Sequence, residues 1–158
     1  SDEYVVRAMR VGCRGLECIA RESEDDPRYD PFGAEFRPEL VLARLQRCGV
    51  SPGTAMQRFD MWVRDVTVGF RPVLAASPTG FDGMWVHWYF DNFYDDENPF
   101  GFGGEDIGSV YKGFVRDMGA SMSTLSIPRE GTRHNALDDA IYQAKEMEEI
   151  LRLMSLKE

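Results

Sequence analysis

A single apolar run constrains the fold of this chain more than any other segment. It is Pro72-Val73-Leu74-Ala75-Ala76-Ser77, which is short, apolar on both faces and bounded by Arg71 and Pro78. Central strands of α/β sheets have this pattern, so we expect a β-strand over residues 72–77. One strand cannot form a sheet, and no second strand is equally clear. Its neighbours are therefore unrecognised in this sequence or lie outside it.

Helical patterns fill most of the remaining chain. The last helix is the best defined, because apolar residues from Leu137 to Met154 follow the i, i+3, i+4, i+7 spacing, with charged residues largely on the other faces. Pro38 and the pair Ser51-Pro52 predict the starts of two earlier helices, and Gly49 predicts the end of the first. We expect helices over residues 3–12, 38–48, 52–66, 81–94, 107–118 and 137–154. We expect an exposed, turn-rich loop at 21–36, a second loop at 95–104 and irregular structure at 119–133.

This pattern predicts one α/β domain over residues 1–158, because neither a linker nor an internal repeat is evident. The aromatic side chains of the helix at 81–94, and His87 among them, are expected to pack in the core. No apolar run approaches the roughly 18 residues of a membrane span, and the acidic start has no signal-peptide pattern. Three cysteines without a Cys-x-x-Cys pair predict reduced structural thiols in a cytoplasmic protein.

The formal net charge of −9 limits the partners of the chain. A protein that holds a long nucleic acid mainly through its phosphates is expected to be basic. This chain is therefore expected to bind such a polymer weakly, or only at a short strand end. Bound divalent cations would lower the repulsion locally.

A histidine and two aspartates stand together at the start of the last helix, in Arg133-His134-Asn135-Ala136-Leu137-Asp138-Asp139. A base that titrates near neutral pH beside a carboxylate suits metal-assisted hydrolysis, in which one group takes a proton and another holds the ion. Taken alone, a histidine is more often a surface or core residue than a catalytic one. Helical periodicity does not decide whether Asp138 or Asp139 points into the site.

Other carboxylates have competing interpretations. Asp82 follows the predicted strand by a tight turn, and ligands of open α/β sheets bind at the carboxyl ends of strands. Asp82 and Asp106 also stand at helix starts, where negative charge is favourable and an aspartate can cap the helix. Asp95 and Glu97 have a metal-binding spacing but lie in a polar loop. A different metal phosphoesterase that uses Asp95, Glu97 and Asp106 is a third interpretation.

These residues, in this order, resemble the DnaQ-like (RNase H-like) 3′–5′ exonucleases of the DEDDh class, in a bacterial and phage branch. The pattern His-x-Ala-x-x-Asp that opens the last helix of that family is present from His134 to Asp139. Phe81-Asp82 resembles the middle motif of the family. Further similar segments are Asn98-Pro99-Phe100-Gly101 and Asp106-Ile107-Gly108-Ser109, and the likeness extends over about residues 1–154.

The resemblance implies an RNase H-like mixed sheet flanked by helices. It implies that Asp82 and Asp139 are ligands of two Mg²⁺ or Mn²⁺ ions and that His134 is the general base. Phe81 and Asn135 would contact the substrate. The implied reaction releases nucleoside 5′-monophosphates from the 3′ end of RNA or DNA. A homodimer is compatible with this family.

The chain departs from the family in one respect. The Asp-x-Glu motif of the first strand is absent from residues 1–158, and by the order of the family it is expected upstream of Ser1, together with the first three strands. Its absence motivates an alternative function, a catalytically silent exonuclease-like module that binds nucleic-acid ends or a protein partner.

Overall fold

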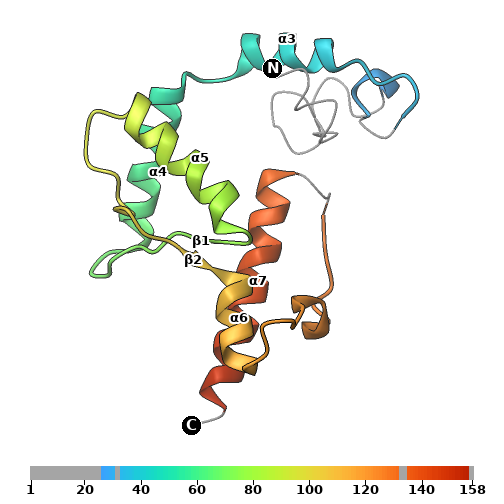
Figure 1. Ribbon diagram of the computed structural model, residues 1–158. Coiled ribbons are helices and arrows are strands. Elements are labelled where there is room, and N and C mark those ends of the chain that lie inside the picture. The colour runs from blue at the N-terminus through green and yellow to red at the C-terminus, as the bar shows by residue number, and fades with distance from the viewer. Residues whose placement is uncertain (1–25, 31–32, 132–134, 157–158) are drawn as a thin grey trace. The chain divides into compact units, whose positions relative to one another are not determined.

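The computed structural model of this chain describes residues 26–30, 33–131 and 135–156 (Figure 1). The helix expected over residues 3–12 lies outside these ranges, as does His134. The chain forms two compact units. One comprises Ser1–Gly49 and Arg129–Tyr142, and the other comprises Val50–Pro128 and Gln143–Glu158.

The first unit contains a 3-10 helix, η1 (Pro27–Tyr29), and helix α3 (Pro38–Cys48). Helix α3 has its predicted bounds, and the N–H of Gly49 closes it by donating to the carbonyl oxygen of Leu45 at 2.8 Å. Val41 is fully buried, and the side chains packed against it are Tyr29, Phe36, Leu42 and Leu45. The expectation of an exposed loop over residues 21–36 is therefore wrong for Tyr29 and Phe36, which cover the apolar side of α3.

The second unit contains helices α4 (Pro52–Val66), α5 (Thr79–Phe93) and α6 (Ile107–Val115), and the 3-10 helix η2 (Met122–Leu125). Helix α7 (Ala136–Ser155) belongs to this unit from Gln143 onward. Helix α4 starts as predicted, because the Ser51 hydroxyl accepts a hydrogen bond from the Thr54 N–H at 3.2 Å. Helix α6 is shorter than predicted. It ends where Arg116 adopts a left-handed backbone conformation, with φ of 60°.

The sheet of the described residues is small. Strands β1 (Ala75–Ala76) and β2 (Glu105–Asp106) pair in parallel, with Ala75 opposite Glu105. The strand expected over residues 72–77 is thus too long, and it is not buried on both faces, because Val73 is 59% exposed. Strand β2 was not predicted because it contains no apolar residue. The mixed α/β class is confirmed, whereas an RNase H-like sheet stays a prediction.

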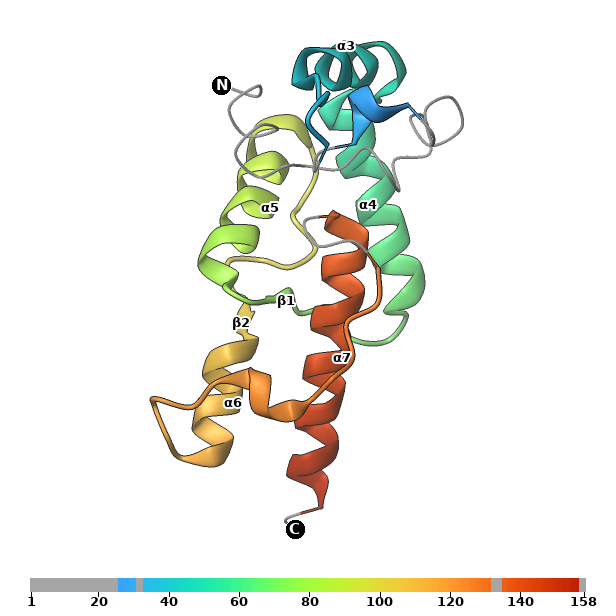
Figure 2. The ribbon, with the colours of Figure 1, turned by 90° about the vertical axis from the view of Figure 1, so that its right-hand side faces the viewer.

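Two apolar clusters stabilise the second unit. Helices α4 and α5 lie side by side in Figures 1 and 2, with Val63, Phe90 and Phe100 buried between α4, α5 and the loop that follows α5. Figure 2 shows α6 beside the C-terminal half of α7, where Ile107, Tyr111 and Ile150 are buried. The junction between β1 and α5 lies close to both clusters, since Leu74 packs on the first cluster and β2 leads directly into Ile107.

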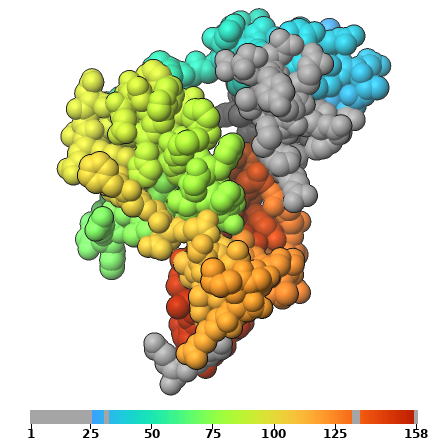
Figure 3. Space-filling model, in the orientation of Figure 1, coloured from blue at the N-terminus to red at the C-terminus, as the bar shows by residue number. Residues whose placement is uncertain are grey.

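Helix α5 is apolar on all sides, and only one side of it is covered. Gly83 and Phe90 are its buried residues. Its exposed large apolar residues are Phe81, Met84, Trp85, Trp88, Tyr89 and Phe93, and Figure 3 shows α5 side chains, in yellow-green, at the surface. The expectation that these aromatic residues pack in the core is wrong for most of them, because α4 and the loop after α5 cover only one face. His87 is half-buried, and its Nδ1 lies 2.8 Å from Nδ2 of Asn98.

The apolar side of α7 is also only partly buried. Ile150 is fully buried, and Met147 packs on the same cluster. Leu137, Ile141, Leu151 and Met154 are exposed, while Glu146, which the sequence placed on a solvent face, is only 6% exposed. The expected burial is therefore wrong for these positions, because packing against α6 and η2 covers a narrower strip than the apolar pattern. No helix within the described ranges combines the length and the apolarity that a bilayer span requires.

Candidate active site

The connection from β1 to α5 is held by side chains from distant segments. The backbone N–H of Ser77, the residue after β1, donates to Oε1 of Gln143 on α7 at 2.9 Å. The next peptide bond, between Ser77 and Pro78, is cis. Pro78 has no N–H, and it is the residue before α5, so helix α5 has no capping side chain of its own.

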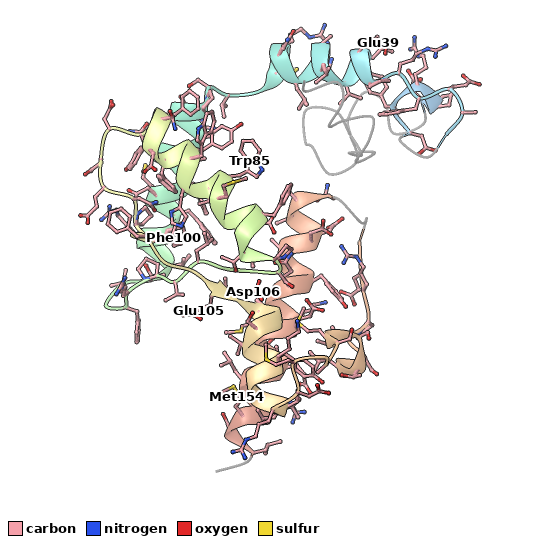
Figure 4. The ribbon with its side chains drawn as sticks, in the orientation of Figure 1. Glu39, Trp85, Phe100, Glu105, Asp106 and Met154 are labelled. Atoms are coloured by element: carbon pink, nitrogen blue, oxygen red, sulfur yellow. The ribbon has the colours of Figure 1, made fainter. Side chains whose placement is uncertain are left out.

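Asp106 supplies the missing cap. Its Oδ2 accepts a hydrogen bond from the backbone N–H of Thr79 at 3.1 Å, and its Oδ1 accepts one from the N–H of Ser109 at 2.7 Å. Figure 4 shows Asp106 where β2 passes into α6. The side chain of Ser109, and then the N–H groups of Ser109 and Thr79, lower the pKa of the Asp106 carboxyl against the opposing effect of burial. The prediction that Asp106 is a helix cap is confirmed, and the cap serves two helices.

Thr79 fixes the same junction through its side chain. Its Oγ1 lies 2.9 Å from the carbonyl oxygen of Ala76 and 2.5 Å from that of Glu105. The hydroxyl therefore bridges the ends of both strands at the point where α5 begins. Nothing in the local sequence around Thr79 indicates this role, because Glu105 is far along the chain.

Asp82 stands on the first turn of α5, directly after this junction. Its side chain is half-buried, whereas the neighbouring Phe81 is 52% exposed. The bonds at Ser77 and Thr79 fix the start of the helix and hence the backbone of Asp82. A carboxylate in this place faces a favourable helix N-terminus and remains accessible to a cation.

The start of α7 is capped by Asn135, which is only 7% exposed. Its Oδ1 accepts hydrogen bonds from the N–H groups of Leu137 and Asp138, both at 3.1 Å. Asparagine is among the preferred residues at this position, so the sequence contained the signal for the cap. The expected contact of Asn135 with a substrate stays a prediction.

Asp139 carries an ion pair on the first turn of α7. Its Oδ1 contacts Nη2 of Arg129, and the side chains of both residues are 30% exposed. The Arg129 guanidinium also lies over the ring of Tyr142, 4.6 Å from the ring centroid. No motif in the sequence pointed to Arg129. Its position shows that the Asp139 carboxylate pairs with a cation.

A buried carboxylate that sequence reasoning missed lies between α4 and α5. Asp60 is only 4% exposed, and its Oδ2 accepts a hydrogen bond from the Tyr94 hydroxyl at 2.7 Å. Both of its oxygens also lie 2.8 Å from Nε of Arg64. Burial raises the pKa of the Asp60 carboxyl, but the hydrogen bonds from Arg64 and Tyr94 outweigh burial and hold the pKa below its ordinary value. These partners give Asp60 a structural role.

The predicted site residues are distributed over the two units. Asp82 belongs to the second unit and Asp139 to the first, while His134 lies outside the described residues. Within residues 26–30, 33–131 and 135–156, no three His, Cys, Asp or Glu side chains are grouped so that they could hold a metal ion. The alternative set of Asp95, Glu97 and Asp106 is among those residues and does not converge.

Asp82 and Asp139 nevertheless have the donor chemistry that a hard divalent cation requires. Mg²⁺ and Mn²⁺ prefer carboxylate oxygens. One of these two carboxylates already pairs with the Arg129 cation, and the other stands half-buried at a helix start. Both residues therefore supply the type of oxygen donor that such an ion requires, although Asp139, like Asp60 and Asp106, has a protein donor on its carboxylate.

Comparison with known proteins identifies the family. Residues 37–151 match the model of the 3′–5′ exoribonuclease Rv2179c-like domain. This match covers more than half of the chain. The chain belongs to the Rv2179c-like exoribonuclease family. The protein is also 30% identical, over 127 residues, to the 3′–5′ DNA exonuclease Cap18 of Escherichia coli, an alignment that covers 73% of this chain and 67% of that relative.

Membership of the Rv2179c-like family accounts for the class of chemistry. A 3′–5′ exonuclease is a hydrolase that acts on nucleic acid, which agrees with the exonuclease prediction at this level. The matched segment includes Asp82, Asp106, His134 and Asp139. The carboxylates and the histidine of the predicted site thus lie within the family domain.

Proposed function

We propose that this member of the Rv2179c-like family is a metal-dependent 3′–5′ exonuclease of the DEDDh type. It would release nucleoside 5′-monophosphates from the 3′ end of RNA or DNA. The observation that carries the proposal is the His-x-Ala-x-x-Asp pattern from His134 to Asp139 at the start of α7, which lies within the segment that matches the family. Family membership supports the direction and the class of the reaction.

In this mechanism the residues of the chain divide the work. Asp82 and Asp139 would be carboxylate ligands of the Mg²⁺ or Mn²⁺ ions. The bound ions would stabilise negative charge on the phosphate and make water more acidic. His134 would accept the proton of the attacking water as general base. Asn135 and Phe81 would contact the terminal nucleotide, one from the cap of α7 and one from the exposed side of α5.

The net charge of −9 is compatible with this substrate. Repulsion between like charges disfavours a long contact with a phosphate backbone. An exonuclease needs to hold only the terminal nucleotides, and the bound cations would neutralise charge where the strand end enters. The relatives do not decide between RNA and DNA as the substrate, because the matched family is named for exoribonuclease activity and Cap18 for DNA exonuclease activity.

The test uses the full-length gene product with 5′-labelled RNA and DNA that have free 3′ ends. We expect stepwise shortening from the 3′ end with Mg²⁺ or Mn²⁺, and none after chelation with EDTA. His134→Ala is expected to lower the rate at least about 10²-fold, the low end for loss of a positioned general base. Asp139→Asn and Asp82→Asn, each of which would remove a carboxylate ligand, are expected to abolish the metal-dependent shortening.

Two matched variants control for the loss of one negative charge, one next to the proposed ligand Asp139 and one far from it in the sequence. Asp138→Asn removes the carboxylate next to Asp139, and Asp95→Asn removes an exposed one in the loop after α5; both should retain activity. Full activity in the Asp139→Asn protein would reject the assigned site. Binding of the 5′-labelled strand without any shortening would favour the silent exonuclease-like module instead.

A further inference from the structure

Two contacts hold the Arg129 side chain at the start of α7. Its Nη2 pairs with Oδ1 of Asp139. Its guanidinium carbon lies 4.6 Å from the centroid of the Tyr142 ring, which is three residues further along the same helix. All three residues belong to the first compact unit. The guanidinium is therefore held on one edge by a carboxylate and on one face by a ring.

The backbone that carries Arg129 lies against the first turn of α7. A Cβ added to Gly131 would lie 2.6 Å from Oδ2 of Asp138, and Gly131 has φ of 79°. Another residue at this position would be strained and would displace the Asp138 side chain, because only glycine adopts such a φ freely. The glycine thus permits the close approach of residues 129–131 to the acidic turn.

The Arg129 guanidinium keeps hydrogen-bonding capacity in this position. Among the residues that the structure describes, Nη2 is the only nitrogen of the Arg129 side chain that makes a hydrogen bond or ion pair, and the side chain is 30% exposed. A guanidinium presents five N–H donors in a rigid fork, so those on Nε and Nη1 remain for a partner from solution. The geometry of that fork matches two oxygens of a phosphate group.

We propose that Arg129 binds a backbone phosphate of the nucleic acid near its 3′ end. This inference rests on the proposed function, which supplies the phosphate. It adds a substrate-binding residue that lies outside the His-x-Ala-x-x-Asp pattern. The role of Arg129 is to hold the strand, and it takes no part in proton transfer.

The local charge explains why an ordered guanidinium is needed. Asp138 and Asp139 repel an anion, as does the net charge of −9. A side chain that is already held by Asp139 and Tyr142 loses little further conformational freedom when a phosphate binds. One fixed cation therefore gives an acidic protein a specific contact with a strand end, without the basic surface that a long polymer requires.

The test measures binding without cleavage. A 5′-fluorescein-labelled single strand with a free 3′ end is added to the full-length gene product in EDTA, and fluorescence anisotropy gives the dissociation constant over about 20 to 200 mM salt. Arg129→Met removes the charge, and Arg129→Lys keeps the charge but loses the fork. Arg152→Met removes the same charge from an ion pair with Glu149 and is the control. The melting temperature of each variant is measured in parallel.

We expect Arg129→Met to make the slope of log K against log salt shallower by about 0.7, the effect of one lost phosphate contact on a single strand. This change corresponds to about fivefold weaker binding at about 0.1 M salt. Arg129→Lys should keep the slope and lose part of the affinity, because lysine has the charge without the bidentate fork. Arg152→Met should match the wild type.

A purely structural role of Arg129 predicts a different pattern. Arg129→Met would then have a lower melting temperature and an unchanged slope, and that result overturns the inference. Equal changes of slope in Arg129→Met and Arg152→Met also overturn it, because net charge alone would then explain the binding. If Arg129→Met does not fold, Tyr142→Leu takes its place. This variant keeps the charge but removes the ring, so it should bind about two- to fivefold more weakly at an unchanged slope, and unchanged binding contradicts the inference.

Binding and cleavage together separate this inference from the proposed function. A wild-type protein that does not bind the strand in EDTA rejects the role of Arg129, even if it shortens nucleic acid with Mn²⁺. A wild-type protein that binds through Arg129 but shortens no strand with Mg²⁺ or Mn²⁺ rejects the proposed exonuclease reaction. Arg129 would then be the phosphate contact of a silent exonuclease-like module.

Discussion

The carboxylate of Asp106 accepts a hydrogen bond from the backbone N–H of Thr79 across 27 positions of sequence. The same carboxylate accepts the N–H of Ser109, three positions ahead of it. One side chain therefore caps the first turns of α5 and α6 together. The residue before α5 is Pro78, which offers no capping side chain, so the cap comes from the start of another helix.

Replacing Asp106 by alanine is expected to remove both caps. Each cap contributes about 1 kcal/mol, so Asp106→Ala should lower the free energy of unfolding by about 2 kcal/mol. Asp106→Asn keeps one acceptor oxygen and should lose about half of that. Urea unfolding followed by circular dichroism measures both values. Asp95→Ala, in an exposed loop, is the control, and equal midpoints for Asp106→Ala and Asp95→Ala would disprove the double cap.

The lowered pKa of Asp106 predicts a pH dependence. A carboxyl whose pKa is lower in the folded state than in the unfolded chain stabilises the fold above its unfolded pKa, near the ordinary value of 3.8. That contribution is lost as the pH falls through the folded pKa. The difference in urea midpoint between the wild type and Asp106→Asn should therefore be largest at neutral pH and shrink below about pH 4. A difference that stays constant down to pH 3 would contradict the assigned pKa shift.

Tyr94 is expected to stabilise the fold through Asp60. Removal of the Tyr94 hydroxyl takes one hydrogen-bond donor from the Asp60 carboxylate, which is only 4% exposed. Because hydrogen bonds to charged groups contribute about 1.5–3 kcal/mol, Tyr94→Phe should reduce the free energy of unfolding by that amount. Thermal or urea unfolding provides the measurement. Tyr89→Phe is the control: it removes a hydroxyl of the same kind from the exposed side of α5 and should change the free energy of unfolding little.

Arg129 is expected to compete with a divalent cation for Asp139. Its guanidinium pairs with Oδ1 of that carboxylate, and both side chains are partly exposed. A partly exposed ion pair contributes about 0.5–1 kcal/mol, which corresponds to about a two- to fivefold change in affinity. Arg129→Met should therefore bind Mn²⁺ about two- to fivefold more tightly by calorimetry.

The matched control for this experiment is Arg152→Met. Arg152 pairs with Glu149 at 2.7 Å, in the last part of α7, and its removal takes away the same charge at a distance from the motif. Equal gains in the two variants would indicate a general effect of net charge. Weaker binding in Arg129→Met would show that Arg129 supports the ligand geometry instead of competing with the ion.

Local patterns in the sequence predicted the helix ends well. Pro38, Ser51 and Gly49 marked helix bounds that the structure confirms, and Asp106 was identified as a cap. These features depend on contacts within about four residues, which the sequence displays directly. The same reasoning failed where a segment is apolar on every side, as in α5, because periodicity cannot show which face a neighbouring helix covers.

The sequence by itself determined the mixed α/β class, the bounds of α3, the start of α4 and the candidate residues Asp82, His134 and Asp139. Only the tertiary structure decided that Asp106 caps a second helix, that Gln143 holds Ser77 and that Tyr94 reaches Asp60. These contacts join residues 27 to 66 positions apart. A hydrogen bond of this kind forms because folding brings two elements together, and no pattern within either segment encodes its partner.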